Sequence, residues 1–282
     1  MIYKTFDIEA LYPQLKKAEN KPLLFAYLRE LSPNIGDGEN HRYPVMVVLP
    51  GGGYSYTSDR EADPIALQYF AAGYHTFILR YSCVPDRYPT SLLQVMATIH
   101  YIRTHADELH ADPERVFVVG FSAGGHLAAS AGTLWKDPVV SGTLGCDAKL
   151  CRPTGMILSY PVISSGEKAH RGSFNQLLGP DATQEQIDAL SLENRVDEDT
   201  CPAFLWHTFT DGSVPVENTL YFTLAMRKAG VPCEVHIYPF GGHGLSMCNK
   251  QSAKGGSADQ IVPHAEGWMD LSIKWLGLFD KE

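Results

Sequence analysis

The sequence has no long apolar run and no cluster of lysine and arginine residues. No segment approaches the roughly 20 apolar residues that a membrane-spanning helix needs. The first residues, Met1–Glu9, lack the basic and apolar regions of a secretory signal. A formal net charge of −9 disfavours nucleic acid or an anionic membrane surface as a partner. We therefore expect a cytoplasmic protein that binds neither.

Cysteine is scarce as well. The six cysteines among 282 residues form no Cys-x-x-Cys pair, so neither a disulfide framework nor a zinc site is predicted. His100, His105 and His110 are spaced five residues apart, which rotates successive helical side chains by about 140° and keeps them off one face. We expect free thiols and no metal.

The chain also lacks a Pro/Ser/Gly-rich linker, and its hydrophobic content of 44% is enough for a large core. We therefore expect a single domain over residues 1–282. From Tyr43 onward, strand-like and helix-like runs alternate, which is typical of parallel βαβ units. The expected fold class is α/β: a mostly parallel, doubly wound sheet flanked by helices.

The predicted elements have the following bounds. An antiparallel edge strand is expected at Leu23–Leu28. The later strands are expected at Val45–Leu49, Thr76–Tyr81, Arg115–Val119, Gly155–Ser159, Ala203–His207 and Glu234–Tyr238. The helices are expected at Asp63–Ala72, Thr90–Leu109, Gly124–Trp135, Val216–Ala229 and Glu266–Phe279.

Residues 164–200 interrupt this alternation. The segment is long, polar and partly helical, and Thr183 with Gln186 resembles a capping box. Insertions of this kind after a strand usually lie over the carboxyl ends of the strands, where ligands bind. We predict a small cap over the active site, and a surface excursion is the alternative.

The run GFSAGG at residues 120–125 stands between an apolar strand and a helix-forming segment. A Gly-x-Ser-x-Gly sequence in that setting is a nucleophile elbow, a tight turn that exposes a serine hydroxyl at the end of a sheet. We therefore predict that Ser122 is a nucleophile.

A serine hydroxyl needs a base within hydrogen-bond reach and an acid that orients the base. In this fold the acid and the histidine follow the serine, each on a loop at the carboxyl end of a strand. Asp211 lies on the loop after the strand that ends at His207, and His243 lies in the Gly-rich loop after the last strand. The other candidates are predicted to be solvated or structural: Asp197, Glu198, Asp199, Glu217, His207, His236 and His264.

The strand ending at Leu49 runs into a triple-glycine loop, Gly51–Gly53. Acyl transfer places a negative charge on the former carbonyl oxygen, and preorganised amides must meet it. We predict an oxyanion hole formed by the amides of Gly52, Gly53 and Ala123. A phosphate loop is disfavoured because no Gly-Lys-Ser/Thr sequence follows the glycines.

With these motifs, the chain from Tyr43 to Phe279 resembles the α/β-hydrolase superfamily. It is most similar to an esterase group that includes hormone-sensitive-lipase-like enzymes and bacterial acetyl esterases related to acetylxylan esterases. The resemblance rests on four motifs: PGGGY at 50–54, GFSAGGHLA at 120–128, DGSVP at 211–215 and GGHG at 241–244. Pro50 stands where many relatives have histidine, and His126 occupies a family position that we interpret as structural.

The resemblance implies an acyl-serine mechanism without a cofactor on small esters, with acetyl groups of carbohydrates such as xylan oligosaccharides as one substrate class. An amidase, formamidase or small serine peptidase with the same triad is the alternative, and a non-catalytic binding protein of this fold is a second. Whether two copies pair as a homodimer is left open. The candidates for lining the substrate pocket are Tyr54, Tyr56, Tyr81, Phe174 and Leu178.

Overall fold

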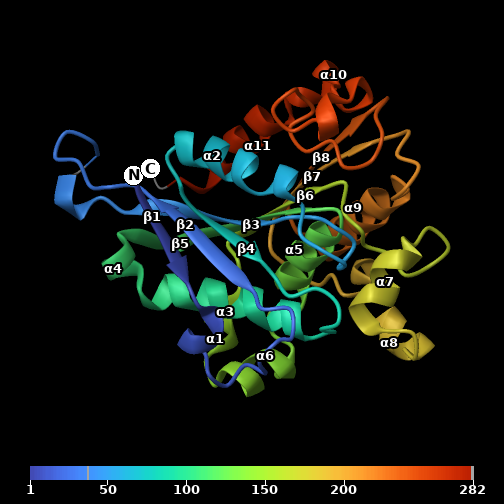
Figure 1. Cartoon of the computed structure of the whole chain (residues 1–282), viewed down its shortest axis with the longest axis horizontal. Helices are drawn as coiled ribbons and strands as arrows, with labels where there is room; N and C mark the ends of the chain where they lie inside the picture. Colours follow the sequence, from blue (N-terminus) through green and yellow to red (C-terminus); the bar gives the residue numbers. More distant parts are fainter. Residues whose placement is uncertain (37, 281–282) are drawn as a thin grey trace.

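The structure, a computed structural model, describes residues 1–36 and 38–280, which form one eight-stranded sheet in the order β1-β2-β4-β3-β5-β6-β7-β8 (Figure 1). Strands β3 to β8 are parallel to one another, whereas β2 pairs antiparallel with both β1 and β4. The strand bounds are β1 Ile2–Phe6, β2 Leu23–Leu28, β3 Tyr43–Leu49, β4 His75–Arg80, β5 Ala111–Phe121, β6 Gly155–Ser159, β7 Ala203–Thr208 and β8 Cys233–Tyr238.

Helices cover both faces of the sheet. Helices α2 and α11 lie on one face, and α3, α5 and α9 on the other (Figure 1). The helix bounds are α1 Ile8–Leu11, α2 Asp63–Ala71, α3 Thr90–Thr104, α4 Ala106–Leu109, α5 Ala123–Thr133, α6 Pro138–Leu144, α7 Arg171–Leu178, α8 Gln184–Ala189, α9 Glu217–Ala229, α10 Pro263–Glu266 and α11 Trp268–Leu276.

The central strands are largely apolar because both of their faces are buried. In β3, Val45, Val47 and Leu49 pack into the core under α3 and α5. Met46 and Val48, which alternate with them, pack under α2 and α11. Near-continuous hydrophobic strands are expected of a parallel sheet covered by helices on both sides.

The predicted fold class, a mostly parallel doubly wound sheet flanked by helices, is confirmed. Two element predictions were wrong. The edge of the sheet is β1 and not β2, because the residues that we took for a polar start pair with β2 from Ile2↔Leu28 to Phe6↔Leu24. The single helix expected at 90–109 is divided at His105 into α3 and α4.

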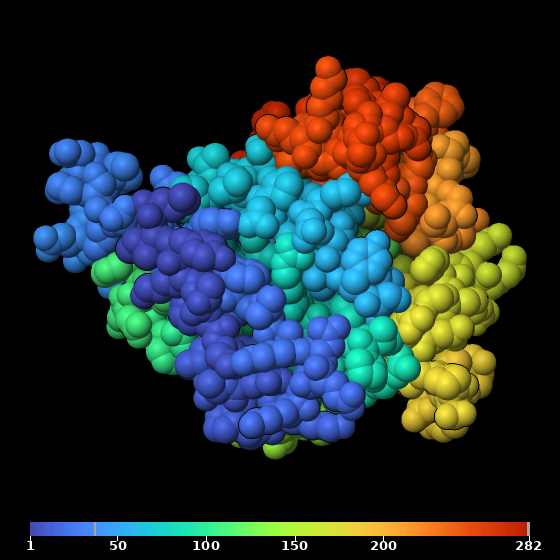
Figure 2. Space-filling view, viewed as in Figure 1, coloured from blue at the N-terminus to red at the C-terminus, as the bar shows by residue number. Residues whose placement is uncertain are grey.

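The segment predicted as a cap contains α7 and α8, and the capping box between Thr183 and Gln186 is present at the start of α8. Figure 2 shows this segment, in yellow, projecting at one side of the molecule below the orange C-terminal part. Its first residues are fixed by Asn218 of α9, whose Oδ1 accepts hydrogen bonds from the amides of Ile163 and Ser164, both at 2.9 Å.

Candidate active site

Ser122 lies between the end of β5 and the start of α5, in a backbone conformation that few non-glycine residues adopt. Its φ is 54° and its ψ is −115°. The turn is held by hydrogen bonds from Ser122 N to Ser159 O and from Val162 N to Ser122 O, each 3.0 Å long. A strained, tightly held serine is the geometry of a nucleophile elbow.

The structure brings together the three side chains that the sequence predicts as a triad. The Oγ of Ser122 lies 2.7 Å from Nε2 of His243, and Nδ1 of His243 lies 2.6 Å from Oδ2 of Asp211. They come from the loops after β5, β8 and β7, at the carboxyl edge of the sheet. This arrangement allows His243 to take a proton from the serine while the aspartate fixes the imidazole.

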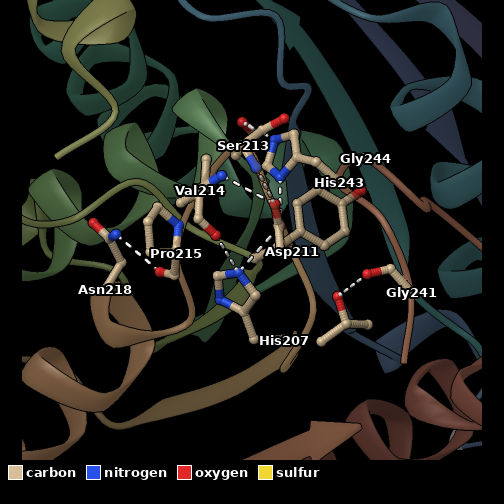
Figure 3. A network of polar contacts seen from close by, with 12 residues as sticks. His207, Asp211, Ser213, Val214, Pro215, Asn218, Gly241, His243 and Gly244 are labelled. Atoms are coloured by element: carbon tan, nitrogen blue, oxygen red, sulfur yellow. Dashed lines mark hydrogen bonds and ion pairs between the residues drawn. The ribbon is translucent and has the colours of Figure 1, made fainter. Parts of the chain in front are cut away.

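Asp211 is held by four donors (Figure 3). The amides of Ser213 and Val214 donate to Oδ1, at 2.9 and 3.0 Å. Oδ2 accepts from His243 and, at 3.2 Å, from Nε2 of His207. Burial raises the pKa of the Asp211 carboxyl, but the hydrogen bonds from His207 and His243 outweigh it, so this pKa lies well below its usual range.

His207 is the residue of this network that sequence reasoning did not assign to the site. Its side chain is fully buried, and its Nε2 also lies 3.0 Å from Val214 O. Because both neighbours of Nε2 are acceptors, this nitrogen carries a proton. The available signal was its position near the end of β7, four residues before Asp211 on the loop that follows.

The loops that carry Asp211 and His243 are joined to each other. The hydroxyls of Thr208 and Thr210 both donate to Gly241 O at 3.0 Å, and Thr210 Oγ1 accepts from Gly241 N at the same distance. These bonds fix the separation of the two loops, and with it the separation of the aspartate and the histidine.

The glycine loop packs directly against the elbow. A Cβ on Gly51 would lie 2.8 Å from Phe121 O and 3.2 Å from the Cβ of Ser122, and one on Gly124 would lie 2.2 Å from Leu49 O. Glycine is therefore needed at both positions for this approach. The amides of Gly52, Gly53 and Ala123 donate to no acceptor within residues 1–36 and 38–280, and Ala123 is the first residue of α5, where helix amides lack intrahelical partners.

The five residues predicted to line the pocket have different positions. Tyr54 and Phe174 are buried and border a narrow hollow that the surrounding side chains almost fill, together with His126, Val162, Ser173 and Leu177. Tyr56 is exposed.

Two predictions of pocket residues need correction. Leu178 borders a different hollow, near Tyr88 and Leu134, because its neighbour Leu177 takes the inward position on α7. The Tyr81 side chain is buried in the core, and its hydroxyl donates to Pro50 O at 2.7 Å.

His126 is structural, as expected. It is fully buried on α5 and links the hydroxyl of Tyr54, at 2.9 Å from Nδ1, to Leu190 O, at 3.0 Å from Nε2. It therefore connects the glycine loop to the cap segment. Burial lowers the pKa of His126 to about 4, so the folded protein holds this imidazole neutral.

This lowered pKa predicts a loss of stability in mild acid. Between about pH 6.5 and 4 the unfolded chain protonates His126 and the folded chain does not, so stability falls as the pH falls through this window. Urea unfolding at pH 7 and 5 should show the wild type losing about 2 kcal/mol more than His126→Gln, which does not titrate. Equal losses in the two proteins would contradict this assignment.

The described residues contain no group of three or more His, Cys, Asp or Glu side chains placed to bind a metal ion. Among the helices described, none is both long and apolar enough to cross a membrane.

The sheet order, the elbow and the position of the three polar side chains define an α/β-hydrolase fold. Residues 34–226 match the family described as BD-FAE. The chain belongs to the BD-FAE family.

Two curated proteins and one solved structure indicate the relatives of the chain. It is 33% identical over 244 residues to endo-1,4-beta-xylanase B of Butyrivibrio fibrisolvens. This alignment covers 85% of this chain and 37% of that protein. It is also 32% identical over 215 residues to acetylxylan esterase of Xylanibacter ruminicola, and this alignment covers 74% of this chain and 42% of that protein. The chain thus spans about two fifths of the length of these curated relatives.

The solved structure is an acetyl ester-xyloside bifunctional hydrolase from Caldicellulosiruptor lactoaceticus. It is 34% identical to this chain and has a TM-score of 0.81. The superposition covers 98% of this chain and 96% of the chain in that structure. These comparisons confirm the family resemblance that the sequence motifs indicate.

Proposed function

We propose that the protein is a serine carboxylesterase that hydrolyses short-chain acyl esters, with acetyl esters as its main substrates. The observation that carries this proposal is the continuous hydrogen-bonded chain from Ser122 through His243 to Asp211 at the carboxyl edge of the sheet. The names of two relatives, an acetylxylan esterase and an acetyl ester-xyloside hydrolase, support acetyl as the acyl group that is transferred to the serine.

In the proposed reaction, Ser122 attacks the ester carbonyl while His243 accepts the hydroxyl proton. His243 then returns that proton to the departing alcohol, which leaves an acyl group on Ser122. In the second half, His243 takes a proton from water, and the resulting attack releases the acid and restores the serine. Asp211 keeps the proton of His243 on Nδ1 throughout.

We assign the oxyanion hole to the amides of Gly52, Gly53 and Ala123. Their N–H groups have no acceptor among the described residues, so they are free to meet the charge on the tetrahedral intermediate. Each such donor typically contributes about 3 kcal/mol to the stability of the transition state.

The size of the hollow beside the elbow favours a small acyl group. Val162, whose amide binds Ser122 O, packs with Tyr54 and Phe174 around this hollow, which the side chains almost fill. A long acyl chain would have to displace these buried side chains, at the cost that overpacking imposes. The alcohol part of the substrate is proposed to be a carbohydrate such as a xylan oligosaccharide, on the strength of the relatives' names.

The test is hydrolysis of p-nitrophenyl esters from acetate to octanoate, followed by release of acetate from acetylated xylo-oligosaccharides. We expect kcat/KM to be highest for acetate and to fall as the chain lengthens. Activity that peaks at octanoate would contradict the acyl assignment. Xylo-oligosaccharides that keep their acetyl groups would contradict the carbohydrate assignment.

An amidase, formamidase or small peptidase with the same triad is the second candidate, favoured by the resemblance of the DGSVP loop to that of prolyl-oligopeptidase relatives. Matched acetyl ester and acetanilide substrates distinguish the two, since an esterase cleaves the ester and leaves the anilide. A wild type without turnover on either substrate would favour a binding protein.

We also propose a cytoplasmic location, which the six free cysteines support because disulfides are rare in reducing compartments. Cys146 and Cys151 form no disulfide, and their sulfurs lie 3.7 Å apart. The single-domain organisation and a homodimer remain predictions.

A further inference from the structure

Glu61 is a buried carboxylate that the proposed reaction does not use. It lies in a short 3-10 turn, Asp59–Glu61, between the glycine loop and α2, and is 4% exposed. Carboxylates are rarely buried unless they are paired or hydrogen-bonded, because desolvating the charge is costly. The partners of Glu61 therefore indicate why it is there.

Both oxygens of Glu61 contact segments that carry the site. Oε2 accepts the amide of Gly51 at 2.9 Å, at the start of the glycine loop. Oε1 accepts the hydroxyl of Tyr160 at 2.6 Å, just after β6. Hydrogen bonds to an ionised acceptor are roughly twice as strong as neutral ones. Glu61 thus joins the proposed oxyanion loop to the strand next to the elbow.

Through Tyr160, these contacts extend to the loop after β8, which carries His243. The Tyr160 hydroxyl accepts the amide of Ser246 at 2.9 Å, and the Tyr160 ring packs edge-on against His243 with ring centroids 5.2 Å apart. Arg60, the neighbour of Glu61, donates to Gly244 O at 2.7 Å and also bonds Ser252 O. One turn therefore holds both the loop before the elbow and the loop after β8.

The packing leaves the loop little freedom while Glu61 is in place. Gly51 lies between the Glu61 carboxylate and the elbow, since a Cβ on it would be 2.7 Å from Oε2 and 3.2 Å from the Cβ of Ser122. On its other side, Pro50 O is fixed by Tyr81. The amides of Gly52 and Gly53 follow directly, so their direction depends on these two anchors.

We infer that Glu61 is a positioning residue, which aims the oxyanion amides by holding Gly51 and couples them to the His243 loop through Tyr160. This rests on the proposed serine-hydrolase mechanism. Its effect is expected in the transition state, where the oxyanion forms, and much less in the binding of the substrate.

The experiment measures Glu61→Gln in two ways. The first is kcat and KM on p-nitrophenyl acetate. The second is the rate at which a fluorophosphonate labels Ser122, a reaction that also forms a charged tetrahedral centre but needs no knowledge of the natural substrate. We expect kcat and the labelling rate to fall together by roughly 10- to 100-fold, with KM changed by less than about threefold.

The matched control is Asp112→Asn. Asp112 is also buried, at 8% exposure, and holds the amide of Glu114 and the side chain of Arg115 at the opposite end of β5. It should lose thermal stability and keep the wild-type labelling rate. A Glu61→Gln protein that behaves like this control would overturn the inference.

A further variant covers the case in which Glu61→Gln does not fold. Glu61→Asp keeps the buried charge but is one methylene shorter, so it cannot reach Gly51 N and the Tyr160 hydroxyl together. We expect the same loss of labelling rate, and an unchanged rate would refute the positioning role. A wild type that is labelled at Ser122 but cleaves no ester would count against the proposed substrate alone.

Discussion

Ser122→Ala is expected to lower kcat on p-nitrophenyl acetate by at least about 10⁴-fold, with the unfolding midpoint close to that of the wild type. In the proposed mechanism the Oγ of Ser122 is the atom that becomes acylated, and this oxygen lies 2.7 Å from Nε2 of His243. Removing it leaves only the catalysis that the oxyanion amides provide. The fluorophosphonate label should also be absent from the variant.

Ser130→Ala provides the control for this prediction. Ser130 is buried on the same helix, α5, and its hydroxyl donates to His126 O at 2.8 Å. Losing this bond costs about 1 kcal/mol of stability and leaves the site intact, so this variant should keep wild-type kcat. If Ser122→Ala retained more than about 1% of the wild-type kcat, Ser122 would not be the nucleophile.

Asp211→Asn is expected to lower kcat by about 10⁴-fold and to lower the stability as well. The four groups around the carboxylate are all donors, so an amide NH₂ would face one or two of them. If the amide oxygen turns toward Ser213 and Val214, its nitrogen faces His243 and favours the tautomer with the proton on Nε2. That tautomer cannot accept the proton of Ser122.

Asp197→Asn is the comparison for the aspartate. Asp197 precedes β7 instead of following it, and its partly exposed carboxylate pairs with Lys136 at 2.8 Å. Exposed pairs of this kind contribute at most about 1 kcal/mol to stability. Measured side by side with thermal unfolding, only the Asp211 variant should lose kcat. Near-wild-type activity of Asp211→Asn would assign the orienting role to another acid.

The parallel strands of the sheet and the three positions that the structure brings together could be predicted because those features have local signals. Apolar runs mark strands that are buried on both faces, such as β6, which was predicted at its observed bounds, Gly155–Ser159. The triad positions follow from chain order once Ser122 is placed after a strand. β1 was missed because its residues are exposed, so no apolar alternation distinguishes it from a polar terminus.

The supporting residues could not be predicted, because their roles depend on contacts between distant parts of the chain. Glu61 has no sequence pattern that links it to Tyr160, since the turn and the end of β6 meet only in the folded sheet. Tyr81 was predicted to line the pocket, but its hydroxyl donates to Pro50 O, a contact that no sequence pattern indicates. His207 was interpreted as structural, and its bond to Asp211 could not be predicted because it requires the conformation of the loop that carries Asp211.

The order of the strands has a consequence for how activity returns after denaturation. Ser122, Asp211 and His243 follow β5, β7 and β8, and β8 is the last strand along the chain and lies at one edge of the sheet. A chain in which β8 has not yet paired with β7 lacks the histidine beside the serine. Because pairings between distant parts of a chain form slowly, we expect recovered turnover to report the pairing of β8, whereas tryptophan fluorescence or circular dichroism reports the rest of the fold.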